Sequence, residues 1–295
     1  MSFRTIVIKN RCKLDYSLNY MVYRGEVTKK VHLSEISMLI VESTAVSITA
    51  VLINELIKNN IAIVFCDEKH SPKSLTLGYH NNYHSAKNIA IQATWKENVK
   101  IDVWTNIIYN KINNQAKLLH KYNLDNKLLM LYLEELQPGD STNREGHSAK
   151  VYFNLLFDML SRRVPSFYNY ALNYGYAILL SAFCREIIAS GYITELGIWH
   201  HNEFNHFNLA SDLMETFRVI VDDMALKLDE KETNYKAKMA NILNVKVFIN
   251  GKNVYLDNAI QIYVKSVLSY LSDGKGEISN YKNYELPIYE NDDNV

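Results

Sequence analysis

Residues 194–223 read TELGIWHHNEFNHFNLASDLMETFRVIVDD, and they lead from a polar loop into a stretch with helical periodicity. The loop carries the histidine pair His200 and His201, and the first turns of the predicted helix carry Asp212 and Glu215. These two acids lie three residues apart, so they share one face of the helix. An imidazole and two carboxylates are common ligands of divalent metal ions. A metal site here would need a further ligand from elsewhere in the chain.

The alternative interpretation of this helix is a solvated acidic face. Its apolar stripe comprises Leu213, Phe217, Ile220, Met224 and Leu228, and the acids Asp212, Glu215, Asp222 and Asp223 fall on a neighbouring face. Glu215 could pair with Arg218, which lies one turn further along. The helix taken alone favours a solvated face, whereas the histidine pair upstream favours a metal site.

The candidate for the missing ligand is Glu145, in residues 141–160, STNREGHSAKVYFNLLFDML. Thr142 and Glu145 fit a capping box, in which Glu145 would only close the first turn of a helix. However, Glu145 lies in line with the apolar stripe of that helix, which comprises Ala149, Tyr152 and Leu156. A carboxylate on the buried side needs a partner, because an unpaired buried charge is too costly. A metal ion is one such partner, and an arginine such as Arg144 or Arg185 is another.

The composition is that of a folded protein with one large or two ordinary domains. The chain has 295 residues, 48% of them hydrophobic, and its few Gly and Pro residues favour long helices. The formal net charge is +0, so a nucleic-acid site would have to be a local basic patch. Three scattered cysteines without a CxxC motif argue against a disulfide framework or a zinc ribbon. Without a signal-peptide pattern or an apolar run of membrane-spanning length, we expect a cytoplasmic protein with no membrane partner.

Residues 1–80 alternate short apolar runs with polar turns, which predicts a small β-rich domain. Strands are expected at Arg4–Lys9, Asn19–Arg24, Lys29–Leu33, Ser37–Glu42 and Ala62–Cys66, with an edge strand at Leu75–Leu77. Residues 47–58 show helical periodicity instead. Cys66, Asp67 and His70 could form a cluster with chemical function, but a solvated turn after a buried strand explains them more simply.

Residues 87–295 are predicted to form a larger all-helical domain, so the chain as a whole is predicted to be α+β. Helical periodicity covers 85–98, 101–122, 125–135, 145–161, 166–190, 209–228 and 257–272. A β-hairpin is expected around Asn250-Gly251-Lys252. The polar and aromatic residues 79–84 break both periodicities, and we place the linker at 81–86. His80 and His84 have no third ligand nearby, so a structural linker is favoured over a metal site.

The 21 tyrosines include a cluster at residues 167–176, FYNYALNYGY. Aromatic residues at helical spacing usually pack in the core, but they could also stack on unpaired nucleobases. Arg162 and Arg163 just upstream would suit a phosphate backbone, although a solvated basic turn explains them equally well. The candidate DNA-binding residues are Arg144, Lys150, Arg162, Arg163 and Tyr174.

Three segments in this order resemble the CRISPR-associated adaptation integrases, the Cas-one family. They are Asn143–Phe153 (NREGHSAKVYF), Ala171–Leu180 (ALNYGYAILL) and Gly197–Arg218. The last one contains a G-x-x-H element that ends at His200 and the sequence DLMETFR at 212–218. A β-rich domain followed by a larger helical domain is also the layout of this family. The phrase HHNEFNHFN resembles the type II-A branch, which accompanies a single-protein effector nuclease.

The resemblance implies a ligand set for Mg²⁺ or Mn²⁺, which is also the catalytic set: Glu145, His200 and Glu215. Asp212 matches a nearby acidic position that assists these ligands. His200, rather than His201, fits the G-x-x-H spacing. Thr216 and Val219 stand where family members often carry proline, and neither position is a ligand.

The reaction that the resemblance implies is insertion of short foreign DNA into a CRISPR array. A 3′-hydroxyl attacks a phosphodiester at the leader–repeat junction, and this transesterification needs no ATP. The implied partners are double-stranded DNA, a second copy of the chain, a bridging dimer of Cas-two and, in type II-A systems, the effector nuclease and a ring-forming accessory protein. We expect the β-rich domain to form much of the dimer interface. A non-catalytic DNA-binding scaffold and a general metal-dependent DNA endonuclease stay open as alternatives.

Overall fold

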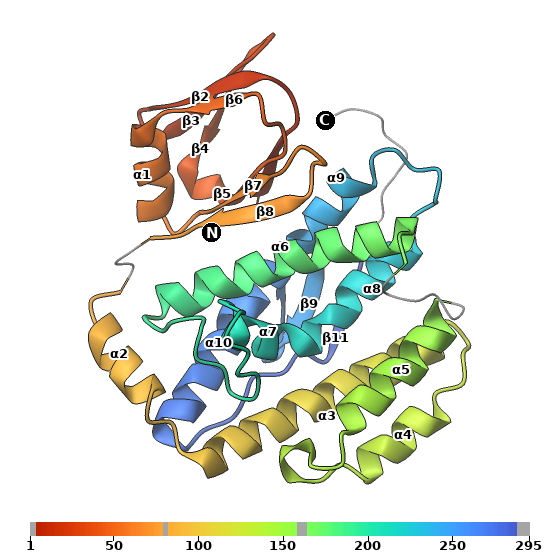
Figure 1. Cartoon of the computed structure of the whole chain (residues 1–295). Coiled ribbons are helices and arrows are strands. Elements are labelled where there is room, and N and C mark those ends of the chain that lie inside the picture. The colour runs from red at the N-terminus through yellow and green to blue at the C-terminus, as the bar shows by residue number, and fades with distance from the viewer. Residues whose placement is uncertain (1–3, 79–81, 158–163, 288–295) are drawn as a thin grey trace.

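The computed structural model describes residues 4–78, 82–157 and 164–287 (Figure 1). An N-terminal part with two β-sheets precedes a larger, mainly helical part, so the predicted α+β class is confirmed. The N-terminal elements are β1 Arg4–Ile8, β2 Cys12–Ser17, β3 Tyr20–Arg24, β4 Thr28–His32, η1 Leu33–Glu35, β5 Ile36–Val41, β6 Val46–Ile48, α1 Ala50–Lys58, β7 Ala62–Cys66 and β8 Pro72–Thr76.

The two N-terminal sheets have the strand orders β1-β5-β7-β8 and β4-β3-β2-β6. In the first sheet, β1, β5 and β7 are parallel, and β8 joins antiparallel to β7. Strands β2 and β6 were not predicted. Strand β2 contains no apolar run, because the charged residues Lys13 and Asp15 flank the fully buried Leu14. This segment is a strand because it pairs antiparallel with β3, and the sequence pattern does not reveal that pairing.

Strand β5 separates two apolar cores, and all six of its residues are buried. Successive side chains of a strand point to opposite faces of the sheet. Leu39 and Val41 accordingly pack with Leu14 and α1, whereas Met38 and Ile40 pack with the helical part. The N-terminal part therefore rests directly on the helices, and β7 and β8 contact α6 (Figure 1).

The C-terminal elements follow from residue 85. They are α2 Ser85–Gln92, α3 Glu97–Lys121, α4 Lys127–Glu134, η2 Pro138–Asp140, α5 Arg144–Leu156, α6 Phe167–Ala189, α7 Asn208–Met214, η3 Glu215–Phe217, α8 Arg218–Leu226, α9 Tyr235–Ala240, η4 Asn241–Asn244, β9 Lys246–Ile249, β10 Lys252–Tyr255, α10 Leu256–Asp273 and β11 Asn283–Glu285. The hairpin expected at 246–256 is present, and β11 adds a third strand to it.

The single helix predicted at 209–228 is wrong, because η3 divides it into α7 and α8. The carbonyl oxygen of Thr216 lies in this 3₁₀ turn and accepts hydrogen bonds from Asn114 Nδ2 (3.2 Å) and Tyr281 Oη (2.8 Å). These bonds come from distant parts of the chain, so periodicity alone could not reveal the break. Its consequence is that Glu215 begins a separate short turn.

Helices α3 and α6 organise the C-terminal part. Helix α6 is surrounded by α7, α8, α9, α10 and the first sheet, whereas α3 contacts α4, α5, η2 and η3. Helix α3 therefore runs past the first turn of α5 and past η3. This path brings together segments that lie far apart in the sequence. None of the helices in the described ranges combines the length and the apolar character that a membrane span requires.

A buried ion-pair cluster at Arg185 connects α6 to α10 and to β5. Arg185 donates from Nη1 to the carbonyl oxygen of Ser37 (2.7 Å), from Nη2 to Asp257 Oδ1 (2.5 Å) and from Nε to Glu186 Oε1 (2.9 Å). The guanidinium is only 5% exposed. It is thus fully occupied and unavailable to Glu145.

The substitution Arg185→Leu should lower the free energy of unfolding by about 3–5 kcal/mol, because it leaves two buried carboxylates without their cation. Urea denaturation followed by circular dichroism measures this change. The matched control is Arg24→Leu, which breaks an exposed pair with Asp15 and should cost about 1 kcal/mol or less. Equal losses in the two variants would contradict a structural role for the Arg185 cluster.

Candidate active site

Two glutamates and one lysine meet beside the middle of α3. Lys111 of α3 donates a hydrogen bond to Glu145 Oε1 in the first turn of α5. The same ammonium lies 2.6 Å from Glu215 Oε2 at the start of η3. Lys111 and Glu215 are each 8% exposed, and Glu145 is 33% exposed. The carboxylates predicted as ligands therefore converge on one point, and a lysine ammonium occupies it.

The charges of this cluster stabilise one another. Burial lowers the pKa of Lys111, but the carboxylates of Glu215 and Glu145 raise it by more, so the pKa lies above its ordinary value. Burial likewise raises the pKa of Glu215, but Lys111 and Arg218 lower it below its usual range. Arg218 Nε lies 2.9 Å from Glu215 Oε1. The partners of Lys111 and Glu215 therefore keep both buried side chains in their charged forms at neutral pH.

Glu145 is held by an unusual helix start. Asn143 has a left-handed conformation (φ 53°) and accepts a hydrogen bond from the amide of Gly146 (3.3 Å). Asp140 accepts from the amides of Arg144 (2.7 Å) and Glu145 (2.9 Å). The predicted capping box starting at Thr142 is therefore wrong. Because Asp140 and Asn143 cap the helix, the Glu145 side chain is left for Lys111.

Neither arginine proposed as a partner for Glu145 contacts it. Arg144 pairs with Glu135 (2.8 Å) and lies over the ring of Tyr132 (5.2 Å). Sequence reasoning missed Lys111 as the partner. A signal did exist, because Lys111 follows Trp104 at +7 and Ile107 at +4, in line with the apolar stripe of the helix predicted at 101–122.

Asp212 organises the loop that carries the histidines. It is fully buried and accepts hydrogen bonds from the amides of Ile198 (2.7 Å), Trp199 (3.0 Å) and His200 (3.3 Å). The backbone passes so close here that a Cβ on Gly197 would lie 2.4 Å from the carbonyl oxygen of His200. The glycine of the G-x-x-H element is therefore required by close packing of the loop against itself and against α7.

His200 is oriented by the same carboxylate, because its Nδ1 is hydrogen-bonded to Asp212 Oδ1. This leaves Nε2 as the nitrogen that can meet a ligand, as in the carboxylate–histidine–metal pattern of many metal sites. The ring stands edge-on to Trp104, with centroids 5.6 Å apart. The hydrogen bond to Asp212 raises the pKa of His200, against burial, which lowers it; Glu215 and Glu145 add smaller increases. His200 thus belongs electrostatically to the glutamate cluster.

The raised pKa of His200 gives a pH prediction for the metal-free protein. A fold that raises this pKa favours the imidazolium form, so its contribution to stability is complete below the unfolded pKa of about 6.5 and is lost as the pH rises through the folded pKa. We expect an NMR titration of the ring protons to give His200 a pKa above 6.5. In Asp212→Asn this pKa should fall, and an unchanged pKa would contradict the assigned contact. His200→Gln identifies the resonance.

The acidic face predicted for the helix at 209–228 is not solvated. Asp212, Glu215, Asp222 and Asp223 are all buried, between 0% and 7% exposed. Asp222 accepts hydrogen bonds from the hydroxyls of Tyr152 (2.7 Å) and Tyr176, and Asp223 pairs with Lys121 (2.5 Å). Each of these acids is buried and has a specific side-chain or backbone partner, which favours a defined site over a solvated acidic surface.

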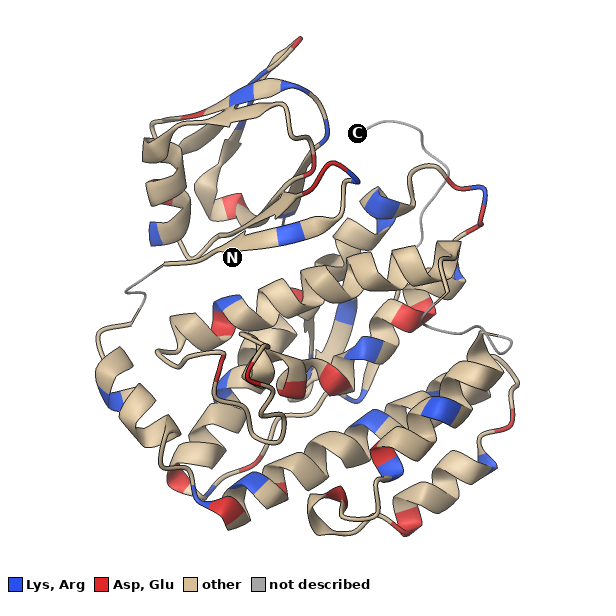
Figure 2. Cartoon of the chain, viewed as in Figure 1, with Lys and Arg blue, Asp and Glu red and all other residues tan. Residues whose placement is uncertain are grey.

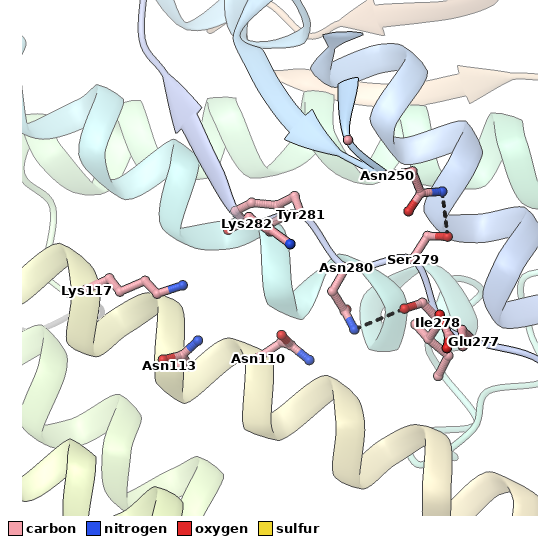
Figure 3. Close-up of a pocket in the computed structure, with 11 residues that line it drawn as sticks. Asn110, Asn113, Lys117, Asn250, Glu277, Ile278, Ser279, Asn280, Tyr281 and Lys282 are labelled. Carbon is pink, nitrogen blue, oxygen red and sulfur yellow. Dashed lines mark hydrogen bonds between the residues drawn. The ribbon is translucent and has the colours of Figure 1, made fainter. Parts of the chain in front are cut away.

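A cavity of about 280 Å³ opens beside the cluster. Its charged and polar lining residues are Lys111, Gln115, Glu145, Tyr176, Glu215, Arg218 and Asp222. A larger cavity of about 580 Å³ lies between α3, the turn of β9 and β10, and residues 277–282 (Figure 3). Its described lining includes four asparagines, Lys117, Lys282 and a single acid, Glu277. The smaller cavity, not the larger one, therefore contains the carboxylate pair.

The candidate DNA-binding residues differ in their exposure and in their partners. Lys150 is exposed on α5, and Arg144 is engaged by Glu135. Tyr174 is only 3% exposed, so it cannot stack on a nucleobase. Arg162 and Arg163 lie outside the described residues. Basic and acidic positions are scattered among each other on the ribbon in Figure 2, so this view does not reveal a uniformly basic element.

The other candidate metal groups do not form metal sites. Asp67 accepts hydrogen bonds from the amides of Lys69 and Ser71 (both 3.0 Å), as expected of a turn. His80 lies outside the described residues. Across the described ranges, no group of at least three His, Cys, Asp or Glu side chains has a geometry that could hold a metal ion.

The donor set at Lys111 nevertheless fits a hard divalent cation. Glu215 Oε2 is buried and is contacted by the Lys111 ammonium at 2.6 Å, so displacement of that ammonium would leave a strong acceptor free for a cation. Carboxylate oxygens with one imidazole suit Mg²⁺ or Mn²⁺, and the imidazole shifts the preference towards Mn²⁺. The Lys111 ammonium lies between Glu145 and Glu215, the two carboxylates that would hold such a cation.

Comparison with known proteins identifies one family. A family model described as "CRISPR associated protein Cas1" matches residues 6–253. The "CRISPR-associated endonuclease Cas1" of Neisseria meningitidis serogroup C (strain 8013) is 29% identical over 299 residues, covering 97% of this chain and 96% of the relative. A solved "Casposase bound to integration product" has a TM-score of 0.75 at 19% identity, covering 94% of this chain and 92% of the other. A "Cas6-RT-Cas1--Cas2 complex" has a TM-score of 0.71 at 18% identity, covering 92% of this chain and 35% of the other.

Proposed function

The chain belongs to the Cas1 family of CRISPR-associated endonucleases and integrases, and on this premise we propose that it is a metal-dependent DNA integrase of CRISPR adaptation. In this proposal, it joins the 3′-hydroxyl ends of captured DNA to the leader–repeat junction by transesterification. The observation that carries the proposal is the convergence of Glu145 and Glu215 on one cation position beside the oriented His200. The similarity in fold to a casposase bound to an integration product adds support.

The proposed catalytic and metal-binding residues are Glu145, His200 and Glu215. A bound Mg²⁺ or Mn²⁺ would lower the pKa of an attacking hydroxyl and offset the charge that develops on phosphorus. Glu145 and Glu215 provide the carboxylates, and His200 presents Nε2. Asp212 orients the imidazole, and Arg218 fixes one oxygen of Glu215.

Protein residues are not required as nucleophiles in this reaction, because the DNA hydroxyl attacks directly. The walls of the cavity contribute further charges to a phosphodiester site. Arg218 lies over the ring of Tyr176 (5.0 Å), whose hydroxyl is bound to Asp222. A cation–π contact of this kind holds the guanidinium in place without neutralising it. Because Arg218 also pairs with Glu215 (2.9 Å), its charge would act on a phosphate in the cavity once a metal ion holds that carboxylate.

Further parts of the proposal rest on the family resemblance. We propose a homodimer with its interface largely in residues 1–80, a linker at 81–86 and a helical catalytic domain at 87–295. A solved neighbour is a complex that contains Cas2, and we propose a bridging Cas2 dimer and double-stranded DNA as partners here. The type II-A branch, its effector nuclease and its ring-forming accessory protein, and action in a prokaryotic cytoplasm complete the proposal.

Product analysis tests the proposal against a general endonuclease and a non-catalytic scaffold. A labelled duplex with 3′-hydroxyl ends is incubated with a supercoiled plasmid that carries a leader and repeat, with Mn²⁺ and with or without Cas2. We expect label joined covalently to relaxed plasmid, and no joining from a duplex with 3′-deoxy ends. Cleavage without joining would indicate a nuclease, and DNA binding without either product would indicate a scaffold.

A further inference from the structure

The loop at 195–207 exposes large apolar side chains beside His200. Leu196 is 40% exposed, Trp199 is 44% exposed and Phe204 is 83% exposed. Isolated exposed apolar residues are common, but three of them in the loop that also carries a proposed metal ligand point to a recognition surface. The side chains of Leu196, Trp199 and Phe204 belong neither to the proposed ligand set nor to the buried core.

Three side chains hold the loop in one conformation although it has no regular secondary structure. Gln92 Nε2 donates to the carbonyl oxygens of Ile193 and Leu196 (both 2.9 Å). Asn208 Nδ2 donates to the carbonyl oxygens of Glu195 and Asn202 (both 3.0 Å). Together with the bonds of Asp212 to the amides of residues 198–200, these contacts fix the backbone of Trp199.

The ring of Trp199 is supported from one side. It stacks on Trp104, with centroids 5.6 Å apart and planes inclined by 6°. Trp104 is buried and also supports the ring of His200. The Cζ3 edge of Trp199 faces Gly139, where a Cβ would lie 3.6 Å away. One face of the indole packs on Trp104 and 44% of the residue is exposed, so Trp199 presents apolar surface to solvent.

We propose that Trp199 is a stacking platform for the nucleobase at the 3′ end of the DNA strand whose hydroxyl attacks. This inference rests on the proposed integrase function. Every nucleobase has a π face, so stacking on an aromatic ring binds DNA without reading its sequence. The last base of a strand end has a face that no neighbour covers. Because Trp199 directly precedes His200 and shares its support, a base stacked there lies beside the proposed ligands.

Tryptophan fluorescence and DNA affinity test the platform, using Trp199→Phe, Trp199→Ala and the matched control Trp95→Phe. The control is apt because Trp95 is buried and packs against Tyr192. Single-stranded DNA with a 3′ end should quench the emission of the wild type and of Trp95→Phe, and this quenching should be lost in Trp199→Phe. Affinity should stay close to the wild-type value in Trp199→Phe, because phenylalanine still stacks. It should fall about tenfold in Trp199→Ala.

Abasic DNA identifies the base concerned. Removing the terminal 3′ base should weaken binding to the wild type about tenfold and binding to Trp199→Ala hardly at all, since the two changes remove the same contact. The proposal is overturned if Trp199→Phe retains full quenching, if the abasic penalty is equal in both proteins, or if a partner protein but not DNA changes the Trp199 emission. Binding and quenching need no turnover, so a failure of the integrase proposal would instead appear as absent strand transfer with these signals intact.

Discussion

Lys111→Met should lower the free energy of unfolding of the metal-free protein by about 3 kcal/mol, the lower end of the cost of breaking a buried ion pair. The substitution leaves Glu145 and Glu215 facing each other without the ammonium between them. Glu145 is one third exposed and Glu215 retains Arg218, so the full penalty for two isolated buried charges does not apply. Chemical denaturation in the presence of a chelator measures this loss.

The same variant should become strongly metal-dependent. In the wild type, a cation that binds the two glutamates must first displace the tethered ammonium, whereas in Lys111→Met it enters a vacant, negatively charged position. Binding to the native state adds about 2.7 kcal/mol of stability when the free metal concentration is 100 times its Kd. Mn²⁺ should therefore raise the Tm of Lys111→Met by more than it raises that of the wild type.

The matched control is Lys121→Met, which removes a lysine of the same helix that pairs with Asp223. Asp223 keeps hydrogen bonds from the hydroxyls of Tyr122 (2.8 Å) and Tyr284 (2.9 Å), so this change creates no vacant cation position. If Mn²⁺ stabilises Lys121→Met as much as Lys111→Met, the lysine does not occupy the metal position, and the assignment of Glu145 and Glu215 as ligands loses its main support.

Glu145→Gln and His200→Gln should each reduce strand transfer by at least about 100-fold, because removal of even a residue that only orients a metal ligand typically costs 10–100-fold. Asp212→Asn should fall within that smaller range, since it acts through the orientation of His200. Glu135→Gln provides a control near α5, because it removes a carboxylate that is 42% exposed and pairs with Arg144. Its activity should stay close to that of the wild type.

These variants are compared by initial rates of label joining at saturating Mn²⁺, after circular dichroism shows that each is folded. A folded Glu145→Gln that joins DNA at the wild-type rate would remove Glu145 from the catalytic set. The same result for His200→Gln, combined with loss of activity in a His201→Gln variant, would shift the role to the second histidine of the pair.

Local pattern predicted much of the fold. The long helix α3 follows from sustained apolar periodicity, helix α6 was expected at 166–190, and the hairpin of β9 and β10 follows from its Asn-Gly turn. The pattern failed where distant residues determine the local structure. The break at Thr216 depends on Asn114 and Tyr281, and β2 depends on pairing with β3 and β6.

For the candidate site as well, the sequence predicted some features and missed others. The inward orientation expected for Glu145 and the metal-binding chemistry expected near His200 both followed from spacing and residue type. Lys111 was missed because lysine in an amphipathic helix is usually a surface residue, and because its partners are 34 and 104 positions away in the sequence. Tyr174 was wrongly placed among the DNA-binding residues, because its helix α6 is buried on nearly all sides.

Anomalous diffraction from a crystal grown with Mn²⁺ tests most directly the claim that Glu145, His200 and Glu215 form one metal site. We predict a single strong Mn²⁺ peak within coordination distance of both carboxylates and of His200 Nε2. We also predict that the Lys111 ammonium leaves the position between Glu145 and Glu215. Lys111 still bridging the two glutamates at saturating Mn²⁺, with the peak absent or elsewhere, would contradict the account.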